Sequence, residues 1–202
     1  MLINKLKSGF TIVELLVSIF IITLLLSVVL FNYGTFNDKL ALSSAGQEMA
    51  IAIRQAQAYG VNVKEVGASG GVFTSAYGVY FNPSCNPDSY YVFADTNANK
   101  KYDIGAGCGN PDTAGELIEK FILRNGVIIS GVCDAATCPL SAPTKSMHVT
   151  FLRPNPDANI NFVDTNGSFV GGQSLTGKIR LTSLKNNTLD IVVENTGQVL
   201  AQ

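Results

Sequence analysis

The feature that most constrains this chain is an apolar run from about Phe10 to Tyr33, which contains one carboxylate, Glu14, and no basic residue. A helix of this length, at about 1.5 Å per residue, is long enough to cross a hydrocarbon core about 30 Å thick. An ionised Asp, the nearest tabulated case, costs about 2.5–3.5 kcal/mol at the centre of a bilayer. Since the run offers Glu14 no basic partner, we expect its partner to come from another molecule.

The residues at the start of the run carry a family resemblance. The segment Lys5-Leu6-Lys7-Ser8-Gly9, followed by Phe10-Thr11-Ile12-Val13-Glu14-Leu15, resembles the class III leader junction of type IV prepilins and type II secretion pseudopilins. The resemblance implies that a prepilin peptidase cleaves between Gly9 and Phe10 and N-methylates Phe10, which leaves Glu14 as the fifth mature residue. An ordinary secretory signal has a 7–15-residue apolar region before its cleavage site. Here the junction precedes a longer run, so we expect the run to be retained.

Cleavage at this junction would create a free amino group on Phe10, close to the level of Glu14 in a neighbouring subunit. In a low dielectric, two such charges attract strongly when paired, and each is costly to bury alone. We therefore expect Glu14 to guide assembly by sensing the register between subunits. Before assembly, Lys5 and Lys7 should hold the N-terminus in the cytoplasm, which predicts a single-pass protein of the inner membrane with its C-terminal domain exported to the periplasm or the cell exterior.

Four segments are predicted. Residues 1–9 form the leader, 10–33 the transmembrane helix, 34–60 the extramembrane half of the same helix, and 61–202 a β-rich globular domain. In the extramembrane half an apolar stripe recurs at helical spacing, and it either packs on the domain or contacts other subunits. We expect its first half to contact other subunits and its last four turns to pack on the domain. The stripe comprises Leu42, Ala45, Met49, Ala52, Ile53 and Ala56.

The remainder of the chain contains short β-branched or alternating runs separated by Asn-Gly and Asn-Pro turns. The fold class is therefore α+β, with a long N-terminal helix packed on an antiparallel β-sheet domain. The resemblance to prepilins implies that this arrangement is pilin-like. The last four predicted strands, at about 147–152, 159–163, 177–183 and 189–194, suggest a meander. The earlier strands are expected at about 78–81, 90–94, 118–123 and 127–130.

Three stretches of the domain, 47–59, 91–103 and 191–199, are similar to the GspH/FimT group of minor pseudopilins and pilins. FimT-like members that bind DNA carry arginines in the final glycine turn. Here that turn is Gly197-Gln198-Val199-Leu200, without the cations on which phosphate affinity depends. The formal net charge of −1 gives no sign of a nucleic-acid surface either. The resemblance therefore favours a secretion pseudopilin or a structural minor pilin, with a DNA-uptake pilin as the alternative.

All four cysteines, Cys85, Cys108, Cys133 and Cys138, lie in the part predicted to be exported. An even number in an oxidising compartment suggests two disulfides with three conceivable pairings, of which we favour Cys85–Cys108 and Cys133–Cys138. Zinc is the competing interpretation. The four cysteines do not show the paired Cys-x-x-Cys spacings that are typical of zinc sites.

A second candidate for metal binding is the segment that follows the strand at 90–94. Asp95, Asn97, Asn99 and Asp103 present oxygens at the first, third, fifth and ninth positions of a calcium loop. However, Lys100 occupies the position of the glycine that makes the sharp turn, and the twelfth position is Ala106 instead of a glutamate. We favour an Asx-rich turn that satisfies its own backbone and assign no metal ligands, with calcium left open.

Nothing in the sequence favours catalysis. The only histidine, His148, lies in an apolar strand, and no nucleophile elbow, phosphate-binding loop or dinucleotide fingerprint is present. We expect no cofactor and no enzymatic activity, with a membrane-anchored exported enzyme as the distant alternative. The predicted partners are other pilin or pseudopilin subunits, the prepilin peptidase, the assembly platform and membrane lipid. The sequence leaves open which system the subunit serves and where in the filament it lies.

Overall fold

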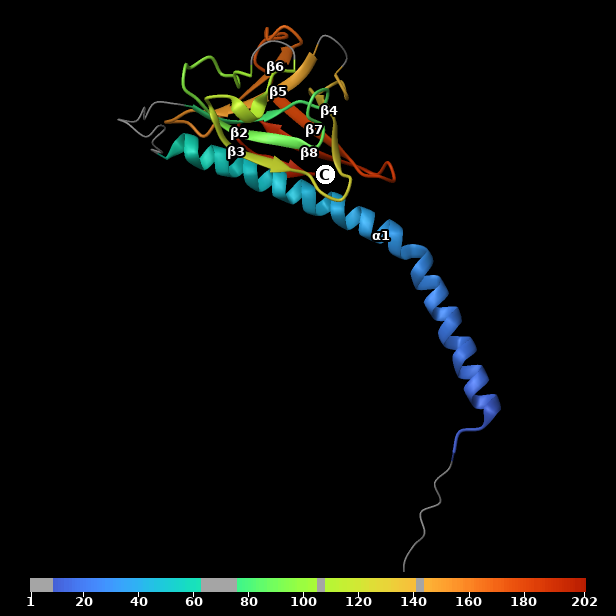
Figure 1. Ribbon diagram of the computed structural model, residues 1–202. Helices are drawn as coiled ribbons and strands as arrows, with labels where there is room; N and C mark the ends of the chain where they lie inside the picture. Colours follow the sequence, from blue (N-terminus) through green and yellow to red (C-terminus); the bar gives the residue numbers. More distant parts are fainter. Residues whose placement is uncertain (1–8, 63–75, 105–107, 141–143) are drawn as a thin grey trace, which may run out of the picture. The chain divides into compact units, whose positions relative to one another are not determined.

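The computed structural model of the chain describes residues 9–62, 76–104, 108–140 and 144–202 (Figure 1). It divides into two compact parts, an N-terminal part (Met1–Asn37) and a C-terminal part (Asp38–Gln202). One helix, α1, runs from Ile12 to Val61 and continues from the first part into the second. The prediction of one long helix is confirmed, within two residues at each end.

The strands of the C-terminal part form two antiparallel sheets. The order is β3-β2-β1-β5-β6 in the five-stranded sheet and β4-β7-β8-β9 in the four-stranded sheet. The α+β class with antiparallel sheet is therefore confirmed. The bounds are β1 Ala76–Phe81, β2 Ser89–Asp95, β3 Leu117–Ile122, β4 Ile128–Cys133, β5 Thr144–Phe151, β6 Ala158–Asp164, β7 Thr176–Thr182, β8 Thr188–Glu194 and β9 Val199–Ala201, with a short 3-10 helix, η1, at Pro111–Thr113.

The expected four-stranded meander is wrong. β6 pairs with β5 in the first sheet, whereas β7 pairs with β4 and β8 in the second, so the β6–β7 connection crosses from one sheet to the other. The five alternating buried and half-buried positions at the start of β6, BiBiB, are the same pattern that a meander strand would have. Such a pattern identifies a strand without identifying its neighbour.

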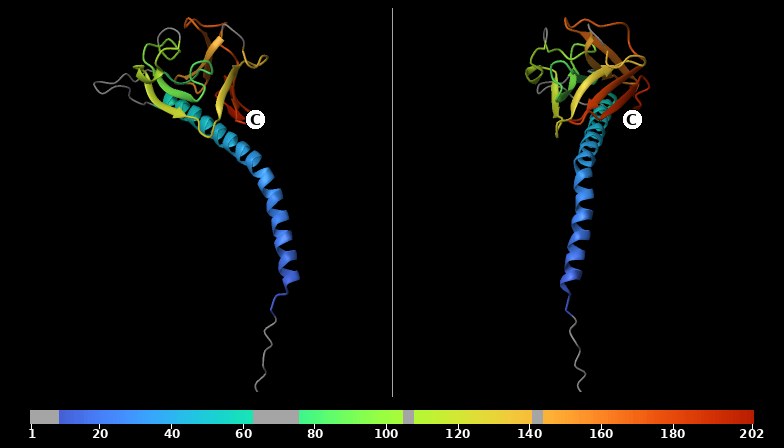
Figure 2. Two further views of the ribbon diagram at one scale, coloured as in Figure 1. Left: turned by 45° about the vertical axis from the view of Figure 1, so that its right-hand side comes forward. Right: turned by 90° about the vertical axis from the view of Figure 1, so that its right-hand side faces the viewer.

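The C-terminal half of α1 lies against the sheets, as both views of Figure 2 show. Its predicted apolar stripe is buried, with Met49, Ala52, Ile53 and Ala56 fully inaccessible. These side chains share one core with residues from both sheets, including Val149 of β5 and Ile191 of β8. The helix approaches β8 closely at Gly46, where an added Cβ would meet Leu189 Cδ2 at 2.3 Å. The stripe therefore packs on the chain's own domain from Leu42 onward.

A second, smaller core lies on the opposite face of the five-stranded sheet. It is aromatic and consists of Tyr80, Tyr91, Phe93 and Tyr102. Because this cluster covers the outer face, every residue of β1 and β2 is buried, on both sides of the sheet. Tyr102 comes from the connection between β2 and β3, and its ring lies 5.4 Å from that of Tyr80 and 5.1 Å from that of Phe93, centroid to centroid.

Two disulfides cross-link the C-terminal part, where Cys133 is the last residue of β4 and the other three cysteines lie in connecting segments. Cys85 pairs with Cys108 and Cys133 with Cys138, with Cα–Cα separations of 5.5 and 4.5 Å. This is the pairing that the sequence analysis favoured. All four cysteines are used, so no thiol is free.

Candidate processing and assembly segment

The candidate cleavage site lies just outside the start of α1. The helix begins at Ile12, and Thr11 caps it by accepting a hydrogen bond from the Glu14 N–H at 3.2 Å through its hydroxyl oxygen. Gly9 and Phe10 precede the cap and have no regular secondary structure. No heavy atom lies within 4 Å of the point where a Gly9 Cβ would stand, and Phe10 is 77% exposed. The Gly9–Phe10 peptide bond is thus open to an enzyme that binds an extended chain.

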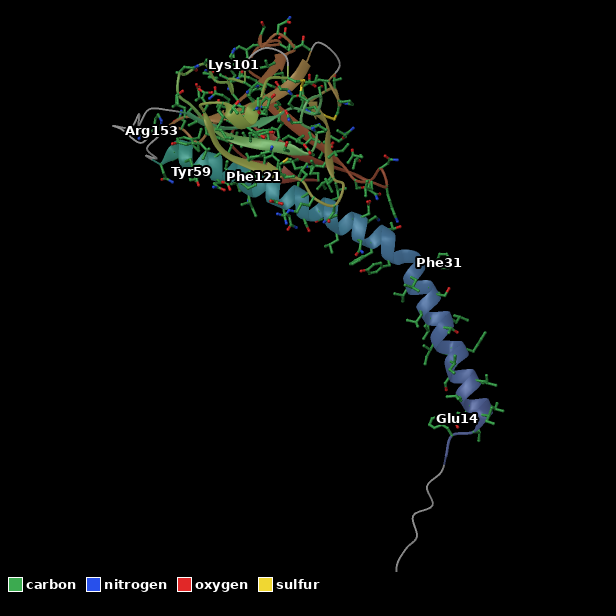
Figure 3. All side chains as sticks on the ribbon, in the orientation of Figure 1. Glu14, Phe31, Tyr59, Lys101, Phe121 and Arg153 are labelled. Carbon is green, nitrogen blue, oxygen red and sulfur yellow. A yellow bond between two sulfur atoms is a disulfide. The ribbon has the colours of Figure 1, made fainter. Side chains whose placement is uncertain are left out.

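Glu14 occupies the first turn of the helix, where a carboxylate is favoured by the helix dipole. Its side chain is exposed, and within the described residues its carboxylate forms no hydrogen bond and no ion pair (Figure 3). The Glu14 carboxylate is therefore accessible to the partner that the sequence analysis expects from another molecule.

The polar residues deeper in the apolar segment satisfy themselves within the helix. Ser18 Oγ donates to the carbonyl oxygen of Glu14 at 2.7 Å, and Thr23 Oγ1 lies 2.9 Å from the carbonyl oxygens of both Ile19 and Phe20. Such bonds remove the cost of placing hydroxyl groups in hydrocarbon. Among the described residues, α1 is the one helix long and apolar enough to cross a membrane, with a mean hydropathy of 2.8 in its most apolar stretch.

The Asn-rich segment after β2, residues 95–103, is stabilised by hydrogen bonds within the segment. The Asp95 carboxylate accepts the backbone N–H groups of Asn99 at 3.0 Å and Lys100 at 2.7 Å, and the Asn99 amide donates to Asp103 Oδ2 at 2.8 Å. Lys100, at the position where a calcium loop has glycine, adopts a positive φ of 62°. Within the described residues no three His, Cys, Asp or Glu side chains are grouped as metal ligands, and Ala106 lies outside them.

Glu116 closes this segment from the other side. Its carboxylate accepts hydrogen bonds from the Thr96 N–H at 2.9 Å, the Thr96 hydroxyl at 3.1 Å and the Asp103 N–H at 3.1 Å. Burial nevertheless raises the pKa of Glu116 above its ordinary value, and the three hydrogen bonds act against that shift. All of these contacts are with backbone and side-chain donors of the segment itself.

His148 is a packed residue of β5, 2% exposed. Its Nδ1 accepts the backbone N–H of Tyr102 at 2.9 Å, and its Nε2 lies 3.2 Å from Ser146 Oγ. Desolvation, with a smaller contribution from the charge of Lys101, lowers the pKa of His148 to about 3. A neutral, enclosed imidazole that holds a loop backbone has no open side from which to act on a substrate.

The final glycine turn is held against α1. Gln57 Nε2 donates to the carbonyl oxygens of Pro156 at 2.9 Å and Gly197 at 3.3 Å, and Arg54 donates to the carbonyl oxygen of Val199 at 3.2 Å. Gly197 has a positive φ of 84°, and an added Cβ would meet Pro156 O at 2.4 Å. The turn is therefore a packing element that joins β8 and β9 to the helix.

One polar clamp was missed by the sequence analysis. Asp38, at the start of the C-terminal part, accepts hydrogen bonds on Oδ2 from Ser183 Oγ and Asn187 Nδ2, both at 2.6 Å. These bonds, and a weaker one from the Lys185 N–H, lower the pKa of Asp38. The partners lie about 145 residues away in the sequence, so no local pattern could have revealed them.

Comparison with known proteins concerns the N-terminal segment. Residues 4–30 match the family described as the prokaryotic N-terminal methylation motif, which is type IV prepilin-like. The match indicates a subunit of the type IV pilin or pseudopilin type. It implies association with other pilin subunits and processing by the prepilin peptidase, and with the apolar helix it indicates membrane anchoring. No curated protein and no solved structure matches the chain.

Proposed function

We propose that this pilin-type chain is a minor subunit of a type II secretion pseudopilus or a type IV pilus, of the GspH/FimT kind. In this proposal it is anchored in the inner membrane, is cleaved between Gly9 and Phe10, is N-methylated on Phe10, and displays its C-terminal part outside. The observation that carries the proposal is an apolar helix whose described side chains from Ile12 to Asn37 are almost all exposed. The carboxylate in its first turn has no partner among the residues that the structure describes. Such a surface needs lipid or other subunits around it.

We also propose that the role is structural and not catalytic. His148 and the four cysteines, which are the residues most able to act as a base or nucleophiles, are committed to a loop hydrogen bond and to two disulfides. The DNA-uptake alternative receives no support from the last turn, because Gly197 and its neighbours contact α1 and carry no cation of their own. A salt-dependent shift of DNA by the purified chain would instead favour the competence function.

The processing step is tested by the intact mass of the chain purified from its native membrane. The expected product lacks residues 1–9 and carries one added methyl group, and Gly9→Ala should retain the leader. A native product that keeps its first nine residues would refute the proposed maturation.

The assembly step is tested with Glu14→Ala, which should remain in the membrane but enter filaments poorly, because the amine of the neighbouring Phe10 then lacks a countercharge. Glu14→Gln is the matched control for side-chain size and should be impaired to a similar degree. Normal incorporation of both variants would mean that charge pairing does not guide assembly.

A further inference from the structure

The feature that leads to a further inference is the end of the C-terminal part around the turn between β7 and β8. The Asp38 clamp ties this turn to α1, and the red β7–β8 hairpin reaches along the helix (Figure 1). Leu184, at the tip of the turn, is 77% exposed. It is backed by the β3–β4 turn, since a Cβ on Gly126 would meet Leu184 Cγ at 2.5 Å. A large apolar side chain is thus exposed on the surface, with the β3–β4 turn behind it.

The three segments that meet at this end of the domain each carry an exposed basic residue. Lys39, Arg124 and Lys185 are all exposed and come from α1, the β3–β4 turn and the β7–β8 turn. Beside them lies an open groove of about 480 Å³, lined by Lys39, Leu42 and Ser43 and by residues 186–189. Lys39 Nζ, the Ser43 hydroxyl and the side-chain amides of the turn are donors suited to a phosphate.

Two carboxylates stand near the same end of the domain. Asp38 is occupied by Ser183, Asn187 and the Lys185 N–H, and the charge of Lys185 acts on it as well. The other is Asp88, whose carbonyl oxygen accepts the Leu123 N–H at 2.8 Å and whose carboxylate accepts the Ser89 hydroxyl at 3.1 Å. These hydrogen bonds leave both carboxylates charged, but the three exposed cations outnumber these two acids.

The position of this surface along the chain limits its distance from the apolar run. The apolar run ends at about Tyr33, and Asp38 follows five residues later. Those five residues span about 7.5 Å as a helix and at most about 18 Å when fully extended. The distance from the end of the apolar run to Asp38 is therefore at most about 18 Å, in any orientation of the two parts. The Asp38 clamp therefore keeps the β7–β8 turn close to the head groups of any bilayer that contains the apolar run.

We propose that Leu184 and the groove beside it form a lipid-binding surface, in which Lys39 and the turn amides take the phosphate of an anionic phospholipid and Leu184 enters the interface. Exposed apolar side chains flanked by basic residues are typical of such interfacial contacts. The inference rests on the membrane anchoring of the proposed function. It gives the subunit a fixed resting position on the membrane before assembly.

The chain contains no tryptophan, so a single introduced tryptophan reports its own surroundings. The full chain carrying Leu184→Trp is placed in lipid nanodiscs, one copy per disc, with phosphatidylglycerol mixed into phosphatidylcholine. Brominated acyl chains should quench its fluorescence and its emission should shift to shorter wavelength. Leu175→Trp is the matched control, because Leu175 is 71% exposed and flanks the opposite end of β7, about 20 Å away. It should be quenched little.

One further variant separates the sources of a negative result. Leu25→Trp, within the apolar run, must be strongly quenched if the chain is anchored at all. Quenching at position 25 with none at 184 beyond that at 175 would overturn the lipid-binding surface and leave the anchor intact. No quenching at position 25 would remove the anchoring on which both proposals rest. A blue shift at 184 without quenching would mean that protein covers the turn, and the lipid assignment would be wrong.

The charge requirement is tested in the Leu184→Trp background. Lys39→Gln and Lys185→Gln should each weaken the docked state by up to about fivefold in anionic discs, and little in discs of phosphatidylcholine alone. Lys178→Gln, on the body of β7, is the matched control and should have no effect. An equal loss for all three variants, or the same quenching in both lipids, would overturn the assignment of Lys39 and the turn to an anionic head group. Circular dichroism of each variant checks that the sheets are retained.

Discussion

Side-chain truncation should destabilise the fold strongly on the buried face of the extramembrane helix and only slightly on its exposed face. The test is a pair of alanine substitutions two residues apart. Met49 is fully buried in the main core, whereas Ile51 is 63% exposed on the same helix. Truncating a buried methionine costs about 2–5 kcal/mol. Substitutions on an exposed surface usually change the free energy of unfolding by no more than about 0.5 kcal/mol.

These free energies translate into melting temperatures. For a protein of this size, each kcal/mol shifts the melting temperature by about 2–4 °C. Met49→Ala should therefore lower it by about 4–20 °C, and Ile51→Ala by no more than about 2 °C. The measurement is thermal circular dichroism of the full chain in nanodiscs, followed at the β-sheet signal.

The same pair separates folding from assembly. If the outward face of α1 contacts neighbouring subunits, Ile51→Ala should reduce incorporation into filaments while leaving the melting temperature in place. Equal melting shifts for the two variants would refute the assignment of these faces, because it would mean that Ile51 also packs inside the domain.

Two further predictions concern the C-terminal part. The disulfides close loops with sequence separations of 23 and 5 residues, so C85S/C108S should lower the free energy of unfolding by about 3 kcal/mol and C133S/C138S by about 2 kcal/mol; thermal melts in the reverse order would contradict the loop-length argument. His148 has a pKa of about 3 in the folded chain, against an ordinary value of 6.5. As the pH falls below 6.5 the unfolded chain takes up the proton first, so the stability that the neutral histidine contributes is lost towards pH 3. The loss in the free energy of unfolding amounts to up to about 4–5 kcal/mol. Urea unfolding at a series of pH values should show a shallower acid loss for H148Q than for the natural chain, and identical slopes would mean that His148 has the same pKa in the folded and the unfolded chain.

The sequence predicted the elements that depend on local chemistry. The helix from Ile12 to Val61 follows from the absence of proline and from apolar residues at helical spacing, and each of the eight expected strands overlaps an observed one. The strand β9 was missed, because its three residues, Val199–Ala201, are too short to carry an alternation. Its existence depends on pairing with β8, which only the folded chain supplies.

The arrangement of the strands could not be obtained in the same way. The pairing of strands far apart in the sequence depends on how both sheets pack together on α1, and the alternation within one strand does not reveal which strand lies beside it. One signal was available but was not used. The continuous apolar and aromatic runs in Ala76–Phe81 and Ser89–Asp95 are typical of strands that are buried on both faces. They indicated that a further segment covers the outer face of the sheet.

The Asp38 clamp also has a mechanical consequence. Any pull on the apolar run enters the C-terminal part through the backbone at Asp38, where hydrogen bonds from Ser183 and Asn187 join the helix to the β7–β8 turn. Beyond that point the buried side chains from Leu42 to Ala56 lie in a row along the helix axis. A tensile load along the helix axis would shear all of these contacts at once. The helix would therefore resist being pulled along the sheets better than being peeled off them from one end.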